Sequence, residues 1–307
     1  MPRTHLEAGA MPVHGAGASK SDAQTQRCAQ ARSLLFVPGN RPERFQKAAR
    51  SGADVVILDL EDSVPAADKG SARTAIAREW AALQACDVPL VVRINASDTA
   101  AGEDDLAWLK GLNPRPAAVM VPKAESREAL AAVHERLDGI VTLPIIESAA
   151  GYAALPSLAA APGVLRLAVG HIDFMADVGI QCDEQESELA PLRFAVAIAT
   201  RLNRLAPAVD GVTVQIDDEA RLRIDAQRAL RFGYGAKLCI HPRQVAMVHQ
   251  ALAPTEPELE WARRVIAADA AAEGAAVQLD GRMVDLPVVL QARRTMARAA
   301  DSSTVRT

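Results

Sequence analysis

Short aliphatic stretches alternate with longer, Ala-rich amphipathic stretches along most of the chain. The aliphatic stretches have strand length, and most are apolar at consecutive positions, as expected for strands that are covered on both faces. The predicted strands are 33–37, 55–60, 90–94, 117–121, 141–146, 165–169, 211–216 and 237–240. The clearest predicted helices between them are 41–50, 71–84, 126–137 and 192–205. Strict alternation of strand and helix predicts parallel strands with helical crossovers, and about eight such units close a (β/α)₈ TIM barrel.

The chain continues past the predicted barrel, which spans 32–253. A Pro-rich break starts a further helix, with Thr255 at its N-cap position. A short segment, 277–285, then leads into a final helix that begins at Leu286. We therefore expect 254–307 to form a C-terminal helical extension that packs on the parent barrel or on a neighbouring subunit.

The N-terminal region, 1–31, mixes small, polar and charged residues without the continuous apolar stretch of a secretory signal, which predicts a disordered tail. No apolar run in the sequence approaches the roughly 18 residues that a membrane span needs. The cysteines are far apart in sequence and form no CxxC pair; they are Cys28, Cys86, Cys182 and Cys239. This spacing argues against a disulfide framework or a zinc site and favours a reducing cytoplasm.

Charge and composition exclude further classes of protein. The 307 residues include 34 Lys and Arg against 38 Asp and Glu, which gives a net charge of -4. This balance argues against a broad cationic surface for nucleic acid or anionic lipid. Hydrophobic residues make up 50% and aromatic residues only 3%, so the core depends on Ala, Val, Leu and Ile. We find no GxGxxG or GxxxxGK[ST] motif at a strand-to-helix turn, which leaves a dinucleotide site or a P-loop without support.

Polar residues follow the predicted strands, where a TIM barrel carries its working side chains. Carboxylates dominate this group: Asp59, Glu61, Asp62, Glu147, Asp173, Asp217 and Asp218. Several carboxylates in one barrel mouth need a compensating cation, and Mg²⁺ typically takes one or two of them together with water and substrate. Glu147 and Asp173 are our first choice of metal ligands because they follow consecutive strands. The alternative is that some of the acids pair with Arg93 or Lys123.

Arg93 ends an apolar strand, where a guanidinium is costly unless it meets an anion. Its planar fork suits a carboxylate or enolate oxygen of a substrate, and a structural ion pair with Asp59 or Glu61 is the equal alternative. The turn Pro38-Gly39-Asn40 precedes a helix and offers backbone N–H groups to an anion. His171 is either a base or, more commonly for a single histidine, a hydrogen-bonding neighbour.

Seven motifs in order carry a resemblance to a known family. They are Arg32-Ser-Leu-Leu-Phe-Val-Pro-Gly-Asn40, Leu58-Asp-Leu-Glu-Asp-Ser63, Val92-Arg-Ile-Asn95, Pro144-Ile-Ile-Glu-Ser148, Gly170-His-Ile-Asp-Phe174, Lys237-Leu-Cys-Ile-His-Pro242 and Gly281-Arg-Met-Val-Asp-Leu-Pro287. Together they resemble the citrate lyase β-subunit-like family, which includes malyl-CoA and citramalyl-CoA lyases. The likeness covers the chain from Arg32 to about Arg298.

The resemblance implies a TIM barrel, Mg²⁺ as cofactor and a homotrimer. It also implies reversible carbon–carbon cleavage of a 3-hydroxyacyl-CoA thioester such as malyl-CoA or citramalyl-CoA, with glyoxylate or pyruvate as the small oxo acid. Glu147 and Asp173 match the metal ligands of the family, with Glu147 also facing the substrate. Arg93 matches the substrate-binding arginine, which stabilises developing negative charge.

Further positions match the family's site by the same resemblance. Asp285 matches an aspartate that the CoA lyases donate to the active site of an adjacent subunit, where it would move a proton at the enolate carbon. The edge where CoA lies is matched by Phe36, Pro38, Gly39 and Asn40. Residues expected to hold metal-bound waters are Asp59, Glu61 and Asp62.

Three other functions stay open at this point. The chain could be the citryl thioester lyase subunit of a citrate lyase complex, which acts on an acyl carrier protein. It could be a thioester hydrolase, or a non-catalytic thioester-binding barrel. The presence of Glu147, Asp173, Arg93 and Asp285 together argues against the last of these.

Overall fold

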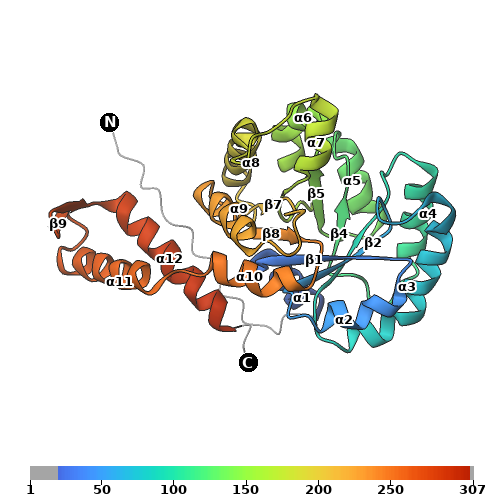
Figure 1. The fold of residues 1–307 in the computed structure, drawn as a ribbon, viewed down its shortest axis with the longest axis horizontal. Helices are drawn as coiled ribbons and strands as arrows, with labels where there is room; N and C mark the ends of the chain where they lie inside the picture. The colour runs from blue at the N-terminus through green and yellow to red at the C-terminus, as the bar shows by residue number, and fades with distance from the viewer. Residues whose placement is uncertain (1–19, 305–307) are drawn as a thin grey trace.

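Eight parallel strands close into a barrel in the computed structural model, which describes residues 20–304. The strands are β1 Ser33–Pro38, β2 Val55–Asp59, β3 Leu90–Arg93, β4 Ala118–Val121, β5 Thr142–Ile146, β6 Ala168–Val169, β7 Val209–Asp210 and β8 Ala236–Cys239. The helices around them are α2 Phe45–Ala49, α3 Lys69–Gln84, α4 Ala100–Leu109, α5 Arg127–Arg136, α6 Ala149–Ala159, α7 His171–Val178, α8 Ala190–Leu202, α9 Glu219–Arg231 and α10 Arg243–Leu252. The predicted (β/α)₈ TIM barrel is confirmed, with the helices as an outer ring (Figure 1).

Each strand pairs with its neighbours in chain order, and β1 closes the ring on β8 through the pair Ser33 and Lys237. Side chains alternate between the barrel interior and the helix layer. In β2, Val55 and Ile57 belong to the interior cluster, whereas Val56 and Leu58 pack under the helices. Both faces of the strand are thus buried, which is why its sequence is continuously aliphatic.

The predicted position of the seventh strand is wrong. β7 is Val209–Asp210, and the predicted stretch 211–216 follows it as irregular chain. Within that stretch Val214 and Ile216 are 52% and 36% exposed. The aliphatic pattern there comes from side chains that line the barrel mouth, a position that sequence periodicity does not distinguish from a buried strand.

The described part of the predicted disordered tail is also helical. Residues Lys20–Gln30 form α1, which covers the N-terminal end of the barrel and buries Cys28 completely. The fully buried Arg166 fixes the end of this helix by donating from Nη1 to the carbonyls of Cys28 and Ala31, both at 2.9 Å. An anchor 138 residues away in sequence is invisible to composition. Residues 1–19 lie outside the described residues.

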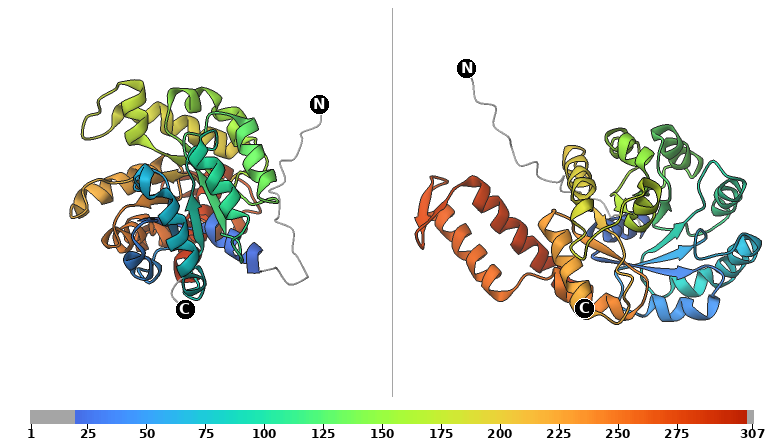
Figure 2. Two further views of the ribbon diagram at one scale, coloured as in Figure 1. Left: turned by 90° about the vertical axis from the view of Figure 1, so that its right-hand side faces the viewer. Right: turned by 45° about the horizontal axis from the view of Figure 1, so that its top comes forward.

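The C-terminal segment forms an arm made of α11 Glu256–Ala271, the hairpin of β9 Val277–Leu279 with β10 Arg282–Val284, and α12 Leu286–Thr304. The arm projects away from the barrel, with the hairpin at its far end (Figures 1 and 2). It has its own small core, which contains Ala262, Val265, Val284, Val289 and Ala292. The predicted N-cap is confirmed, because Thr255 and Glu258 form a reciprocal capping box. Over 20–304, no helix has the length and apolarity to cross a membrane.

Candidate active site

The strand alternation turns four predicted site residues toward the barrel axis at its C-terminal end. Phe36, Asp59 and Arg93 lie in β1, β2 and β3, two positions beyond interior residues of the same strands. Glu147 follows β5 with the same phase. Sequence positions more than 100 apart therefore share one layer at the mouth.

Arg93 makes a bidentate ion pair with Asp59. Its Nε and Nη2 each donate to one oxygen of that carboxylate at 2.7 Å, and Nη1 lies 2.8 Å from Glu61 Oε2. Burial acts to raise the pKa of Asp59, but the hydrogen bond and charge of Arg93 outweigh it and hold that pKa below its usual range. The guanidinium is fixed in place, and about two of its five N–H donors remain for another oxygen.

The expected CoA edge borders this ion pair. The guanidinium carbon of Arg93 lies 4.7 Å from the centroid of the Phe36 ring, a cation–π contact. The amide of Gly39 donates to the carbonyl of Asp59 at 2.8 Å, and a Cβ at Gly39 would lie only 2.7 Å from that oxygen. Pro38 ends β1, and the Asn40 amide donates to Asp68 Oδ2 at 3.3 Å.

Glu147 is a buried carboxylate held from two sides. The backbone amide of Lys123 donates to its Oε1 at 2.7 Å. On the other side Gly170 packs so closely that a Cβ there would lie 2.4 Å from Glu147 Oε2. Burial raises the pKa of Glu147 to about 8; the Lys123 amide lowers it, and the neighbouring carboxylates Glu61 and Asp173 raise it further. A cation bound to this carboxylate would offset the cost of burying its negative charge.

Asp173 is exposed in the first turn of α7, and its charge acts on Glu147. The two oxygen donors that the sequence assigns to the metal are thus brought together at the mouth. Within 20–304, no group of three His, Cys, Asp or Glu side chains is arranged to hold a metal. Two carboxylates match what Mg²⁺ takes from a protein when water and substrate complete its shell, so the donor set fits this ion.

Lys123 completes the mouth between β4 and β5. Its backbone is left-handed, with φ of 46°, an uncommon conformation for a residue with a side chain. Its ammonium lies 3.4 Å from Glu61 Oε1, and its side chain is 51% exposed. The charge of Glu61 raises the pKa of Lys123, so the ammonium is charged at neutral pH.

Several other predicted acids have structural partners instead. Asp217 lies 2.6 Å from Arg243 Nη1, and Asp218 caps α9 by accepting from the amide of Arg221 at 2.9 Å. Asp62, expected in the water shell, is on the exposed rim 3.7 Å from Arg93 Nη1. These positions show how a carboxylate near a strand end serves a helix cap or an ion pair.

His171, the candidate base, is buried against Gly211, where a Cβ would lie 2.1 Å from its Nδ1. Burial lowers the pKa of the imidazole, so the ring is neutral at pH 7. His171 borders a cavity of about 530 Å³ beside α7 that Ile172, Met175 and Val214 also line. The candidate base is therefore a neutral side chain in the wall of this cavity.

The sequence did not reveal a buried polar cluster between β7, β8 and helices α8 and α9. Asp210 accepts from Arg193 Nε at 3.1 Å and lies 3.6 Å from Lys237 Nζ. Glu186 binds both Arg193 and Arg228, which fixes the loop before α8. The Asp-Gly pair after Ala208-Val209 was the available signal, because it ends an aliphatic run.

At the N-terminal end, Ser33, His249 and Asp54 lie together without forming a hydrolase triad. Ser33 Oγ lies 2.8 Å from His249 Nε2, and the same nitrogen lies 3.3 Å from Asp54 Oδ2. In a triad one ring nitrogen accepts the serine proton while the other donates a hydrogen bond to the carboxylate, whereas here both contacts are at Nε2. Ser33 is also 0% exposed. This cluster ties β1 to α10 and carries no support for the hydrolase alternative.

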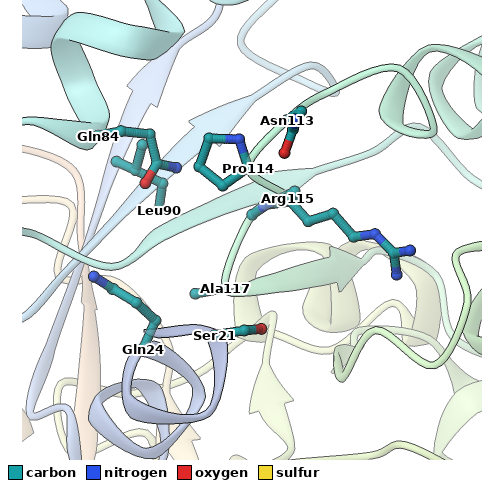
Figure 3. Close-up of a pocket in the computed structure, with 9 residues that line it drawn as sticks. Ser21, Gln24, Gln84, Leu90, Asn113, Pro114, Arg115 and Ala117 are labelled. Carbon is teal, nitrogen blue, oxygen red and sulfur yellow. The ribbon is translucent and has the colours of Figure 1, made fainter. Parts of the chain in front are cut away.

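A second cavity, of about 300 Å³, opens at the same N-terminal end (Figure 3). Ser21 and Gln24 of α1 form one wall, and the segment from Asn113 to Ala117 forms the other. The Arg115 side chain points away from this cavity and donates to the carbonyl of Leu137. Among the described residues, Arg115 is the one charged residue in the lining of this cavity, which contains none of the carboxylates that gather at the mouth.

Asp285 is far from the mouth of its own barrel. It follows β10 at the far end of the arm and lies near the N-terminus of α12 (Figure 1). Its carbonyl accepts from the amide of Val289 at 3.0 Å. Any contact between Asp285 and a barrel mouth therefore requires a second chain.

Comparison with known proteins agrees with this fold. The profile of the HpcH/HpaI aldolase/citrate lyase family matches residues 32–242. The chain belongs to this family. A citrate lyase subunit beta-like protein of Deinococcus radiodurans is 35% identical over 280 residues, which are 88% of this chain and 97% of the relative. An L-malyl-CoA/beta-methylmalyl-CoA lyase of Cereibacter sphaeroides is 35% identical over 302 residues, covering 87% and 94% of the two chains.

A solved relative places ligands on the same fold. The crystal structure of CitE from Mycobacterium tuberculosis in complex with magnesium, acetoacetate and coenzyme A superposes with a TM-score of 0.76 at 34% identity, over 89% of this chain and 99% of that one. Another CitE structure from that organism holds magnesium and pyruvate. This HpcH/HpaI family member is thus a carbon–carbon lyase by family, and its relatives bind Mg²⁺.

Proposed function

We propose that this HpcH/HpaI family member is a Mg²⁺-dependent lyase that cleaves or forms a 3-hydroxyacyl-CoA thioester of the malyl-CoA or citramalyl-CoA type. The observation that carries the proposal is the fixed Glu147 carboxylate, held by the Lys123 amide and Gly170 beside Asp173. The names of the relatives support the thioester class, and the oxo acids in related structures support the second product.

Cleavage breaks the bond between C2 and C3 of the acyl group. The hydroxyl gives up its proton as its carbon becomes the oxo carbon, and the electron pair of the broken bond passes to the thioester as an enolate. The enolate carbon then takes up a proton, so the number of protons is unchanged overall. Glu147 and Asp173 would hold Mg²⁺, which supplies Lewis-acid chemistry and a template for the oxo acid when bound. The charge of Asp173 in the first turn of α7 acts on Glu147, which follows β5, and this supports a shared role.

Arg93 would stabilise the enolate oxygen with the N–H donors that Asp59 and Glu61 leave free. The bidentate ion pair keeps the guanidinium from reorienting during the reaction, which is the condition for electrostatic stabilisation. Asp59 and Glu61 are thus proposed to position Arg93 directly. Phe36 and the turn at Gly39 would border the CoA thioester on the adjacent edge.

Asp285 would reach this chemistry only in a closed homo-oligomer, which we propose to be a homotrimer. The arm stands clear of its own barrel, and its Met283 and Leu286 are 69% and 64% exposed at the end that carries Asp285. A small two-helix arm with such exposed apolar residues supports packing on another subunit. Asp285 would then protonate the enolate carbon of the neighbouring site.

Subunit mixing tests the shared site. Glu147→Gln lacks a working metal site but keeps its arm, and Asp285→Ala keeps its barrel but lacks the acid. Both pure variants are expected to be inactive. After the two are unfolded and refolded together in equal amounts, about a quarter of the sites combine an intact barrel with an intact arm, so about a quarter of wild-type activity returns. If Asp285→Ala alone keeps full turnover, or the mixture stays inactive while both variants fold, the donated acid is wrong.

Activity is tested with purified protein, Mg²⁺ and the thioesters malyl-CoA and citramalyl-CoA. We expect release of glyoxylate or pyruvate, read out as the phenylhydrazone, and loss of release with a chelator. A citrate lyase subunit would instead require an acyl carrier protein, so citryl thioesters on CoA and on the carrier form the comparison panel. Absence of any oxo acid from the CoA thioesters, with Mg²⁺ present, would overturn the proposal.

We also propose a reducing compartment such as the cytoplasm. The four cysteines, including the buried Cys28 and Cys239, are unpaired. Burial raises the pKa of both buried thiols to about 12, so they are unreactive and stay reduced without a partner.

A further inference from the structure

We infer that the Lys123 ammonium binds the carboxylate of the oxo acid beside the metal site. The inference rests on the proposed function because it names the group that holds one of its products. It draws on the exposure and backbone of Lys123 and on its position beside Glu147, the proposed metal ligand.

The first observation is that the cationic side chains at the mouth differ in how freely they can bind an incoming anion. Arg93 is buried, with its side chain 11% exposed; its Nε and Nη2 donate to Asp59, and its Nη1 forms an ion pair with Glu61. The Lys123 side chain is 51% exposed, and its ammonium has one contact distance of 3.4 Å, to Glu61 Oε1. An ammonium has three donors, so it can turn toward an incoming anion without breaking a buried pair.

The second observation is location. The same residue that carries the ammonium donates its amide to Glu147 Oε1 at 2.7 Å. The charges of Glu61 and Glu147 both act on the ammonium, which places it within electrostatic range of the proposed metal ligand. An oxo acid at Glu147 would therefore present its carboxylate within reach of Lys123, while the enolate oxygen lies with Arg93.

The third observation is backbone strain. A left-handed conformation costs a residue with a Cβ about 1 kcal/mol or more relative to glycine, and such strain concentrates at functional sites. Gly would satisfy the φ of 46° and still donate its amide to Glu147, so the backbone does not require lysine.

The test measures Mg²⁺ and pyruvate binding to the full-length protein by calorimetry. Lys123→Gly keeps the left-handed turn and the amide, Lys123→Gln keeps a polar side chain without the charge, and Lys123→Arg keeps the charge. The control is Lys110→Gln, at an exposed lysine that follows α4 at the opposite end of the barrel. Methyl pyruvate, which lacks the carboxylate, is the control ligand.

We expect Mg²⁺ affinity within about twofold of wild type in all four variants. With Mg²⁺ saturating, pyruvate affinity falls tenfold or more in Lys123→Gly and Lys123→Gln, about threefold or less in Lys123→Arg, and not at all in Lys110→Gln; these estimates take the pair as a partly exposed charge-assisted contact. Methyl pyruvate affinity is expected to be the same in wild type and Lys123→Gln.

The outcomes separate the two claims. Pyruvate affinity within twofold of wild type in Lys123→Gln overturns the inference and leaves the lyase proposal intact. Loss of Mg²⁺ affinity in Lys123→Gly, or an equal loss of pyruvate and methyl pyruvate affinity, also overturns it, because the residue then acts through structure. If the wild-type protein binds no oxo acid in the presence of Mg²⁺, both the inference and the proposed function fail.

Discussion

Gly170→Ala is the sharpest test of the proposed metal site, because it changes the support of Glu147 without touching a charged group. A Cβ at position 170 would lie 2.4 Å from Glu147 Oε2, 2.7 Å from Glu147 Cβ and 3.0 Å from Ile145 Cγ2. Contacts under 3.0 Å are essentially never made by real Cβ atoms, so the glutamate must move. The amide of Lys123 holds the other carboxylate oxygen at 2.7 Å, so the side chain cannot swing aside without losing that bond.

The expected magnitudes follow from these distances. Relief of the overlap requires a shift of about 1 Å, and overpacking of this kind costs roughly 1–3 kcal/mol of stability. A displaced metal ligand is expected to lower Mg²⁺ affinity about 10–100-fold, by analogy with loss of a supporting contact. A misplacement of about 1 Å at the reacting group is expected to lower kcat/KM about 10²-fold.

Calorimetry with Mg²⁺, thermal unfolding and oxo-acid release measure the three effects. Gly70→Ala is the matched control, because a Cβ there meets nothing within 4 Å and the residue lies in the first turn of α3. It should leave Mg²⁺ affinity and turnover at the wild-type level. The reasoning is refuted if Gly170→Ala folds and binds Mg²⁺ as tightly as the control.

Three further predictions follow from the packing. Arg93→Lys removes the bidentate pair with Asp59, so kcat should fall about 10²–10³-fold while thermal unfolding shows a folded protein. Arg166→Met leaves buried carbonyls of Cys28 and Ala31 unpaired, so urea unfolding should show a loss of roughly 3 kcal/mol or more; a smaller loss than 1 kcal/mol would mean that the anchor of α1 is unimportant. Burial acts to raise the pKa of Asp54, but its hydrogen-bonding and charged partners lower that pKa from 3.8 to about 2. The ionised Asp54 therefore contributes about 2 kcal/mol to the free energy of unfolding above pH 4, and this contribution is lost as pH falls toward 2. Asp54→Asn should lack that part of the acid-induced loss of stability in urea titrations from pH 5 to pH 2.

The order of strands and helices could be predicted from the sequence because each barrel strand is buried on both faces. Val55–Asp59 has no solvent-facing side, so its aliphatic run appears without alternation. The seventh strand was placed too late because Val214 and Ile216 carry the same pattern in a loop at the mouth. The pattern of apolar residues indicates that a segment is buried or locally apolar. It does not show which other element packs against the segment.

The helix at the N-terminal end of the described residues could not be predicted from the sequence for a similar reason. Helix α1 has little apolar surface of its own, and it is fixed by Arg166 from the other half of the chain. Such an anchor leaves no local signal. The same holds for Asp210 and Glu186, whose partners are arginines of α8 and α9.

By itself, the sequence determined the closed barrel of this protein, the C-terminal extension and the identity of the charged residues at the strand ends. These depend on local patterns: strand length, helix spacing, caps and the rule that parallel strands bring their C-terminal ends to one face. Only the tertiary structure decided which carboxylate pairs with which cation or backbone amide. It joined Arg93 to Asp59, set Glu147 between the Lys123 amide and Gly170, and carried Asp285 away from its own barrel. Ion pairs and close packing are fixed by distances across the fold, and a linear sequence holds no record of those distances.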